Sequence, residues 1–505
     1  MIMKRMFISM LLIVTVASSC SNFEDLNTNP DSTTKVTSEM LATEALKQTF
    51  ISKGDAKAYI GRNALSKYVG MDRDIPSEQY NLISGCSFDS YTIIPNLDKM
   101  VEYALGTKYE SAFKGLAAFI KAYNFYRLTM MTGDIPCSEA AQALDGIRQP
   151  KYDLQKDVLD EILRLLQVAD KEFAEARDFG GDFVFGGDTE KWKKATNAFC
   201  LKVLISMSAK ITPEQKELFS EIVRSSVLME DNSDNLQLIY TSTKGTWHPL
   251  YNQTLFAPYT VVSSIMVDEL KKLKDRRLFY IAEPAPEKTD EGKDATDYDA
   301  YNGVEMSISS DELSLDFHQG KYSIINKRYI SEQAGDPFVL LSYAEQCFII
   351  AEAAERGWLN VDSRNYYEKG VTAALQMFAS YDKENVYNHG MKIDDAYISS
   401  YFVGEAAYKA TTQERLQQIW MQKYFIKFLQ DGVDAYFDFR RNGYPEFPVD
   451  PETNLNIDNK SGFPMRWKYP SGEYQTNENN VNEALQRQFT KGYDGINELM
   501  WLLKD

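Results

Sequence analysis

Cysteine and histidine are scarce in this sequence, and neither residue type forms a cluster. The 505 residues include five cysteines, at positions 20, 86, 137, 200 and 347, and three histidines, His248, His318 and His389. A zinc site needs four nitrogen or sulfur ligands close together, or three and a water molecule. A disulfide framework needs paired cysteines at regular spacings. The sequence therefore predicts neither arrangement, and we expect no metal and no cofactor.

Positive charge is also in short supply, as are the common catalytic signatures. Lysine and arginine number 55 against 73 acidic residues, which gives a net charge of −18. Such an acidic surface repels phosphate backbones, so we expect no nucleic-acid partner. The motifs GxGxxG, GxxxxGK[ST], HExxH and GxSxG are absent, and with them the signatures of nucleotide binding, zinc proteolysis and serine hydrolysis. The sequence thus carries no signature of these three classes.

Long apolar runs are missing except at the N-terminus. Lys4 and Arg5 precede an uncharged, mainly apolar stretch over residues 6–16, which is too short to span a bilayer but fits the core of a signal peptide. Small residues at 17–19 then lead into Cys20, and this junction resembles a bacterial lipobox, whose cysteine receives diacylglycerol. We predict a signal peptide over 1–19, lipidation of Cys20 and a lipidated tether over 20–36. Several acyl chains hold such a protein stably on a membrane.

Amphipathic helices account for most of the remaining pattern. Apolar residues recur at helical spacing over 110–131, 153–175 and 190–209. A capping-box sequence at 342–345 opens a helix that ends at Gly357, and a partner helix follows over 364–380. Another capping box at 411–414 opens a helix that we expect to end near Gly432. Paired helices with short links are typical of a helical array.

Two segments depart from the helical pattern. Residues 230–335 mix small polar residues with aromatic ones, and residues 442–480 consist mostly of turn-forming residues. Long loops in a compact protein are usually functional or disordered. Because these loops carry many aromatic side chains, we favour an ordered, functional role. We expect the chain from 37 to 505 to form a single domain with an all-α dominated fold.

Aromatic residues are abundant, with 31 tyrosines, 27 phenylalanines and 6 tryptophans. A sugar ring has one apolar face and a rim of hydroxyls, so its binding site needs flat aromatic rings beside amides and hydroxyls. The stretch GTWHPLYNQTLFAPY at 245–259 provides that mixture. The alternative is that these rings only pack the loops onto the helices. The candidate ligand-binding residues are Trp247, His248, Tyr251, Asn252 and Tyr259 in this stretch, with Arg73, Tyr80 and Tyr91 upstream.

Several collinear stretches resemble the SusD/RagB family of outer-membrane nutrient-binding lipoproteins, and in particular its SusD-like branch. FEDLNTNP at 23–30 is similar to the opening of the family, and GLAAFIKAYNFYRLTMMTGDIP at 115–136 to its helix ending in Gly-Asp-(Val/Ile)-Pro. PFVLLSYAEQCFIIAEAAERGW at 337–358 matches a further helix, and FRRNGYP at 439–445 resembles a late element of the family. The resemblance implies a TPR-like helix-pair scaffold with a loop-rich ligand-binding half.

The same resemblance implies a function and a location. Family members bind glycans or peptides, are generally not enzymes and cap a SusC-like TonB-dependent transporter. The resemblance thus implies that this protein is not an enzyme, which is consistent with the absence of those catalytic signatures. The leading hypothesis is a lipoprotein on the outer membrane of a Gram-negative bacterium, facing the exterior, that captures an oligosaccharide for such a transporter. The alternatives are a peptide-binding member of the family, a TPR-type structural adaptor and a glycan hydrolase, which would need two carboxylates at a defined separation.

Overall fold

Helices make up nearly all of the regular structure. A computed structural model describes residues 35–51 and 56–504, in which the four β-strands are only three or four residues long. They form two antiparallel pairs, β1 (Val69–Met71) with β3 (Thr260–Val262) and β2 (Leu236–Leu238) with β4 (Phe338–Leu341). The predicted all-α dominated fold is confirmed.

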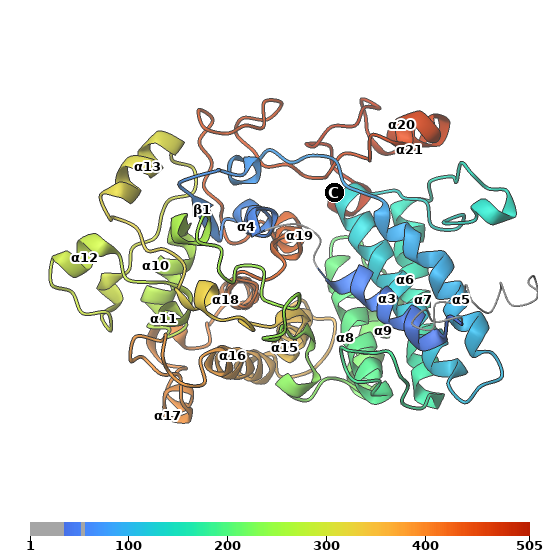
Figure 1. Cartoon of the computed structure of the whole chain (residues 1–505), viewed down its shortest axis with the longest axis horizontal. Coiled ribbons are helices and arrows are strands. Elements are labelled where there is room, and N and C mark those ends of the chain that lie inside the picture. The colour runs from blue at the N-terminus through green and yellow to red at the C-terminus, as the bar shows by residue number, and fades with distance from the viewer. Residues whose placement is uncertain (1–34, 52–55, 505) are drawn as a thin grey trace, which may run out of the picture.

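One half of the molecule is a bundle of long helices, seen at the right of Figure 1. The core of this bundle half is built around Trp192, which is fully buried and stacks on Phe50 and Phe173 at centroid distances of 6.5 and 6.2 Å. Its indole Nε1 donates a hydrogen bond to Asp182 Oδ2 at 2.8 Å. The helices are α3 (Ser38–Phe50), α5 (Ile94–Ala104), α6 (Glu110–Thr132), α7 (Gln155–Glu175), α8 (Thr189–Ser206) and α9 (Pro213–Ser225).

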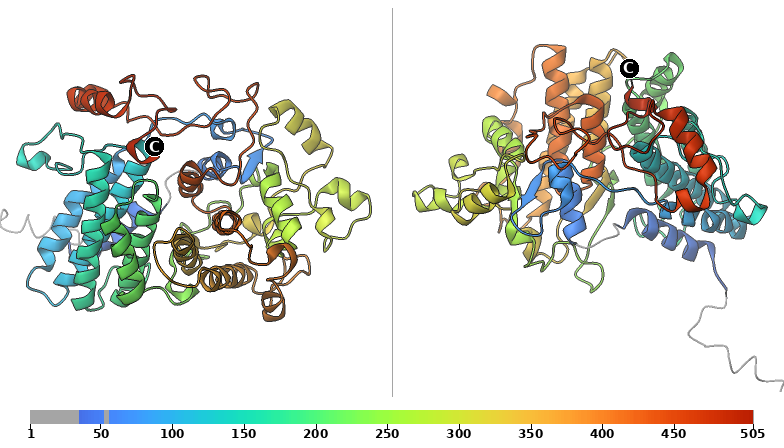
Figure 2. Two further views of the ribbon diagram at one scale, coloured as in Figure 1. Left: turned by 180° about the vertical axis from the view of Figure 1, so that it is seen from behind. Right: turned by 90° about the horizontal axis from the view of Figure 1, so that it is seen from above.

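The other half, which we call the loop-rich half, holds shorter helices and most of the irregular chain. Figure 2 shows this division from behind and from above. Segment 230–335 contains five α-helices, none longer than ten residues, and no helix or strand lies between residues 442 and 473. The helices of this half are α4 (Ala56–Leu65), α10 (Ser264–Leu273), α11 (Leu278–Ile281), α12 (Pro286–Asp290), α13 (Ser310–His318), α14 (Arg328–Ser331), α15 (Tyr343–Glu355), α16 (Ser363–Tyr381), α17 (Asp395–Ser399), α18 (Thr412–Ile426) and α19 (Gly432–Asn442). Helices α20 (Glu473–Thr476) and α21 (Glu478–Gln488) follow later in the chain and lie above the bundle half in Figure 1.

The end of α15 follows its predicted signal closely. Gly357 lies just past the helix with a φ of 71°, the left-handed conformation that favours glycine. The amide of Trp358 donates to the carbonyl of Ala353, and that of Gly357 to Ala354, both at 2.9 Å. These two bonds form a Schellman motif, which satisfies carbonyls that the helix itself leaves free. The helices predicted over 110–131, 153–175, 190–209, 343–357 and 364–380 are all present, with α8 ending at Ser206.

The expected role of Gly432 is wrong. Helix α18 ends at Ile426, and Gly432 is instead the first residue of α19. A Cβ atom at this glycine would lie 2.2 Å from the carbonyl oxygen of Arg62 in α4. Residue 432 is therefore a glycine because the backbones of α19 and α4 approach closely there, and not because a helix ends.

Four buried charges form a closed ring of ion pairs that joins α8, α15, the C-terminal end of α18 and α19. Lys202 Nζ lies 2.7 Å from Asp434 Oδ2 and 3.0 Å from Glu345 Oε1. Lys427 Nζ lies 2.7 Å from the same Asp434 oxygen and 2.6 Å from Glu345 Oε2. Each of the four side chains is more than nine-tenths buried. Since each charge has two partners of opposite sign, the ring ties the four helices to one arrangement.

A second buried acid, Glu352 of α15, makes stability depend on pH. Burial alone would raise the pKa of Glu352, but the charge and hydrogen bonds of Arg441, with smaller contributions from Lys423 and Arg356, lower it to about 2. In the unfolded chain this carboxyl titrates near its ordinary value of 4.5. Because the folded pKa is the lower one, the contribution of Glu352 is present above pH 4.5 and is lost as the pH falls toward 2.

We therefore expect Glu352→Gln to flatten the pH dependence of stability in acid. Between about pH 4.5 and 2.5 the free energy of unfolding of the wild type should fall more steeply than that of the variant, by up to about 1.4 kcal/mol per pH unit. Urea denaturation at a series of pH values measures both slopes. Glu478→Gln, at the start of α21, is a control that should keep the wild-type slope. Parallel curves for the wild type and Glu352→Gln would contradict this assignment.

Candidate ligand-binding site

The β1–β3 pair brings two predicted site residues together. Strand β1 ends at Met71 and β3 begins at Thr260, and the amide of Asp72 extends the ladder by donating to the carbonyl of Tyr259 at 3.0 Å. The guanidinium carbon of Arg73 then lies 4.1 Å from the centroid of the Tyr259 ring. This is a cation–π contact on an exposed arginine, whose side chain is 55% accessible.

Helix α13 completes this aromatic site. The ring of Tyr259 packs against Phe317, near the end of α13, with centroids 5.9 Å apart. Beneath Arg73, the buried carboxylate of Asp72 lies 4.0 Å from Nε. Arg73, Tyr259 and Phe317 therefore form a partly exposed platform with a positive charge on one ring face.

An open groove lies at the other end of α13. Its volume is about 470 Å³, and three separate loops form its walls. Tyr80 provides the aromatic wall, and its hydroxyl donates to the carbonyl of Ile308 at 3.1 Å. The lining combines apolar and hydroxyl side chains with one carboxylate, a mixture that suits an amphipathic, hydroxyl-rich ligand. The groove is lined by Ile75, Pro76, Ser77, Tyr80, Ser309, Ser310, Glu452, Thr453 and Leu455.

The loop at 245–259 exposes some of its predicted residues. Trp247 is 37% accessible, and its ring meets Tyr251 edge-on at a centroid distance of 5.2 Å. The indole Nε1 donates to the carbonyl of Ser242 at 3.1 Å, which fixes the orientation of the ring. Asn252 is exposed and adopts a φ of 56°. Trp247, Tyr251 and Asn252 thus present ring and amide groups at the surface.

His248 points in the opposite direction. It is 3% accessible and lies among the rings of Tyr59, Tyr240 and Tyr329, at centroid distances of 5.9, 5.2 and 6.3 Å. Its Nδ1 accepts a hydrogen bond from the amide of Leu250 at 3.2 Å. Burial, with a smaller effect of the Arg328 charge, lowers the pKa of His248 to about 3, so the ring is neutral. We correct its expected role: His248 supports the loop and offers no surface to a ligand.

Tyr91 lies apart from the other candidates. Its ring packs on Phe88 and Phe125, at centroid distances of 5.3 and 6.1 Å, and its hydroxyl donates to the carbonyl of Pro136. Burial raises the pKa of this hydroxyl well above its ordinary value. The predicted residues therefore fall into separate places: the platform and groove beside α13, the Trp247 loop, and the packed ring of Tyr91.

Comparison with known proteins assigns the family. A model of the SusD-like family, described as starch-binding and associating with the outer membrane, matches residues 30–470. The chain belongs to the SusD-like family. Its helix pairs accordingly form a TPR-like scaffold, and members of the SusD-like family are binding proteins rather than enzymes.

Solved structures of SusD-like proteins agree with this assignment. A SusD homologue from Bacteroides fragilis is 40% identical, with a TM-score of 0.88, over 93% of this chain and 100% of that one. A Bacteroides vulgatus protein described as an outer-membrane protein involved in nutrient binding is 30% identical, with a TM-score of 0.82 over the same shares. A chitin-binding SusD homologue from Flavobacterium johnsoniae shares the fold at 19% identity, with a TM-score of 0.70 over 93% and 99% of the two chains. No curated protein matches the chain.

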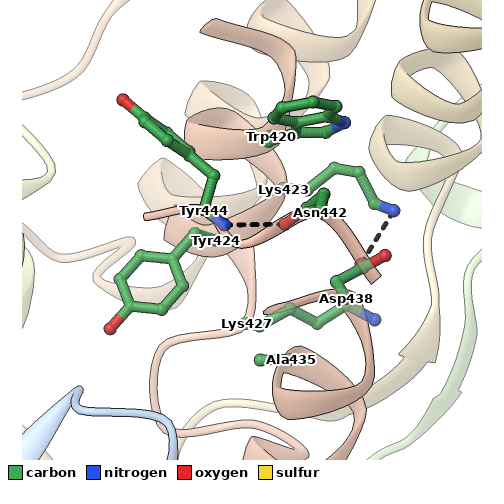
Figure 3. Close-up of a pocket in the computed structure, with 8 residues that line it drawn as sticks. All are labelled: Trp420, Lys423, Tyr424, Lys427, Ala435, Asp438, Asn442 and Tyr444. Carbon is green, nitrogen blue, oxygen red and sulfur yellow. Dashed lines mark hydrogen bonds and ion pairs between the residues drawn. The ribbon is translucent and has the colours of Figure 1, made fainter. Parts of the chain in front are cut away.

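One cavity in this SusD-like chain is too small to be the nutrient site. It lies between α18 and α19, where Lys423 Nζ pairs with Asp438 at 2.8 Å and the amide of Tyr444 donates to Asn442 Oδ1 at 2.9 Å (Figure 3). Its volume of about 10 Å³ matches one water molecule and excludes a sugar ring. The cavity is therefore structural.

Two further features of the SusD-like chain bear on its chemistry. Within residues 35–51 and 56–504, no group of three or more histidine, cysteine or acidic side chains is arranged to hold a metal ion. In the same part of the chain, no helix is both long and apolar enough to cross a membrane.

Sequence reasoning missed several residues of the groove and platform. Phe317, Ser309 and Thr453 lie in segments that it recognised only as loop-rich. A signal for α13 was available, because Ser309 caps the helix by accepting from the amide of Glu312 at 3.2 Å. The contact of Phe317 with Tyr259 depends on the tertiary fold and has no local signal.

Proposed function

We propose that this protein is a surface lipoprotein that binds an oligosaccharide in its loop-rich half and delivers it to a SusC-like TonB-dependent transporter. The observation that carries the proposal is the combination of the partly exposed rings of Trp247, Tyr251 and Tyr259 with hydroxyl and amide groups around α13 and the Trp247 loop. Tyr80, which lines the groove, is 8% accessible. The description of the family as starch-binding, and the chitin-binding homologue, support a carbohydrate ligand. The proposed contacts are Arg73, Tyr80, Trp247, Tyr251, Asn252 and Tyr259.

Two features of these residues favour a sugar over a peptide. Aromatic faces and hydroxyls match the apolar face and hydroxyl rim of a pyranose. One common mode of peptide binding adds the peptide as a strand to an exposed sheet edge, and the strands in the described parts of this chain are only three or four residues long. Titration with oligosaccharides and with a peptide distinguishes the two ligand classes.

The proposed location follows from the N-terminus and the family. Cys20 and the signal peptide at 1–19 lie outside the described residues, so their role remains a prediction. The description of the family as associating with the outer membrane supports anchoring there through lipid. We propose that the anchored protein faces the cell exterior, where it would meet nutrients before the transporter does.

Replacing Trp247 tests the ligand contact. We expect Trp247→Ala to weaken oligosaccharide binding about fivefold to tenfold, a loss of roughly 1 to 1.4 kcal/mol, because one stacking platform is removed. The melting temperature should stay nearly constant, since the ring is partly exposed and its main contact is Tyr251. Isothermal titration calorimetry against a glycan panel measures the affinity. Tyr103→Ala, an exposed ring on α5 of the bundle half, is the matched control and should bind like the wild type. Unchanged affinity in Trp247→Ala would remove this residue from the site.

A further inference from the structure

A second cleft, of about the same volume as the groove, separates the bundle half from the loop-rich half. Its volume is about 440 Å³, and it shares no lining residue with the groove beside α13. Residues of α3 and α6 form one wall, and residues of β4 and α19 form the other. Figure 1 labels the three helices α3, α6 and α19. The lining includes Thr49, Ser90, Tyr123, Asn124, Arg127, Phe338, Asp431 and Trp467.

Three polar atoms in this cleft are buried without a partner. Thr49 Oγ1, Ser90 Oγ and Asn124 Nδ2 make no hydrogen bond to any residue in the described ranges. They come from α3, the short helix at Asp89–Ile93 and α6, and all three side chains also line a recess of about 10 Å³ beside the cleft. Asn124 is only 7% accessible. Buried polar groups are nearly always hydrogen-bonded in folded proteins. Three buried polar atoms without a partner around one recess therefore indicate that a group from outside the protein forms hydrogen bonds there.

Asn124 is also an unusual choice for stability alone. An unsatisfied buried donor destabilises a protein, and an apolar side chain of similar size would remove that penalty. Asn197, one helix away on α8, shows the ordinary arrangement: its Nδ2 donates to Asp170 Oδ1 at 2.8 Å and to the carbonyl of Val227 at 3.0 Å. The contrast indicates that Asn124 serves a ligand rather than the fold.

The rest of the cleft selects a neutral, amphipathic ligand. Arg127 of α6 forms an ion pair with Asp431, and the lining holds one further cation and one further anion, Arg62 and Asp89. The formal charges of the lining therefore sum to zero. The aromatic residues Tyr123, Phe338 and Trp467 add apolar surface to the lining. A cleft of this size accommodates a small ligand, and it combines ring faces, hydroxyls and an amide without net charge.

We propose that this cleft is a second binding site, for a neutral polyhydroxylated ring of mono- or disaccharide size, with one ligand hydroxyl entering the recess of Thr49, Ser90 and Asn124. The site is independent of the proposed function of the loop-rich face. Hydroxyl groups both donate and accept, so one hydroxyl can satisfy the amide donor and either side-chain hydroxyl together.

The test uses a full-length chain whose loop site is disabled. In an Arg73→Ala/Trp247→Ala background, methyl α-D-glucopyranoside and maltose are titrated by calorimetry into detergent-solubilised protein. We expect a remaining binding event that Asn124→Leu weakens at least about tenfold. The melting temperature of Asn124→Leu should equal or exceed that of its parent, whereas Asn197→Leu, which breaks two hydrogen bonds, should lower it.

A second variant provides an independent test in case Asn124→Leu does not fold. Thr49→Val combined with Ser90→Ala keeps the shape of the recess, removes two hydroxyls and should weaken the same binding event. The proposal is overturned if neither probe binds the background protein at concentrations up to about 50 mM, or if both recess variants bind as tightly as their parent. Failure of the loop site would instead show as unchanged affinity in the Arg73 and Trp247 variants, so the two proposals fail separately.

Discussion

Asp434→Asn should lower the free energy of unfolding by about 3 to 5 kcal/mol, the range found when one partner of a buried ion pair is removed. The substitution keeps the size of the side chain but leaves Lys202 and Lys427 with Glu345 as their only shared anion. Burial alone would raise the pKa of Asp434, but the charges of the two lysines hold it far below its usual value. The carboxylate is therefore ionised throughout the physiological range, and its loss uncovers a buried positive charge.

Urea denaturation of wild type and variant at neutral pH measures this loss. The control is Asp98→Asn, which breaks an ion pair with Lys121 in which the aspartate is 63% accessible, and should change stability much less. Replacing the whole ring with apolar residues could be neutral, so the single substitution is the informative one. A loss below about 1 kcal/mol in Asp434→Asn would show that the ring does not hold the four helices together.

Cys20→Ala should abolish incorporation of labelled fatty acid and move the protein out of the membrane fraction. Loss of the fatty-acid label should be complete because Cys20 is the predicted acceptor. After the N-terminal run, no 18 consecutive apolar residues occur that could form a membrane-spanning helix. Each acyl chain contributes about 0.8 kcal/mol per buried CH₂, so losing every chain removes the whole anchor. Cys86→Ala is the matched control and should be labelled like the wild type. Equal labelling of Cys20→Ala and wild type would contradict lipidation at this residue.

The scaffold helices could be predicted well because the spacing of apolar residues and the residues at helix ends are local features of the sequence. Apolar spacing located α6, α7 and α8, and Gly357 ended α15 where expected. The same reasoning misjudged Gly432, because its reason lies in α4, far away in the chain. Sequence reasoning also identified Glu345 only as part of a helix cap. Ser342 does cap α15 by accepting from the amide of Glu345, but the carboxylate pairs with Lys202 of α8 and with Lys427, directly after α18.

The candidate site was less accessible to prediction, since loops have no periodicity that separates buried from exposed side chains. Composition pointed to the stretch at 245–259, yet it could not distinguish Trp247, which is partly exposed, from its neighbour His248, which is buried. The contact between Arg73 and Tyr259 arises from the pairing of two three-residue strands, which the sequence pattern did not predict. The ring of Tyr91 illustrates the packing alternative, in which an aromatic side chain only fills space.

The most direct test of the central claim is a calorimetric titration of the full-length protein with maltoheptaose, chitohexaose and a neutral peptide of similar length. We expect an oligosaccharide to bind with a dissociation constant between about 1 μM and 1 mM. Arg73→Ala and Trp247→Ala should each weaken this binding while leaving the melting temperature unchanged. Binding of the peptide alone, with no heat from either oligosaccharide, would contradict it.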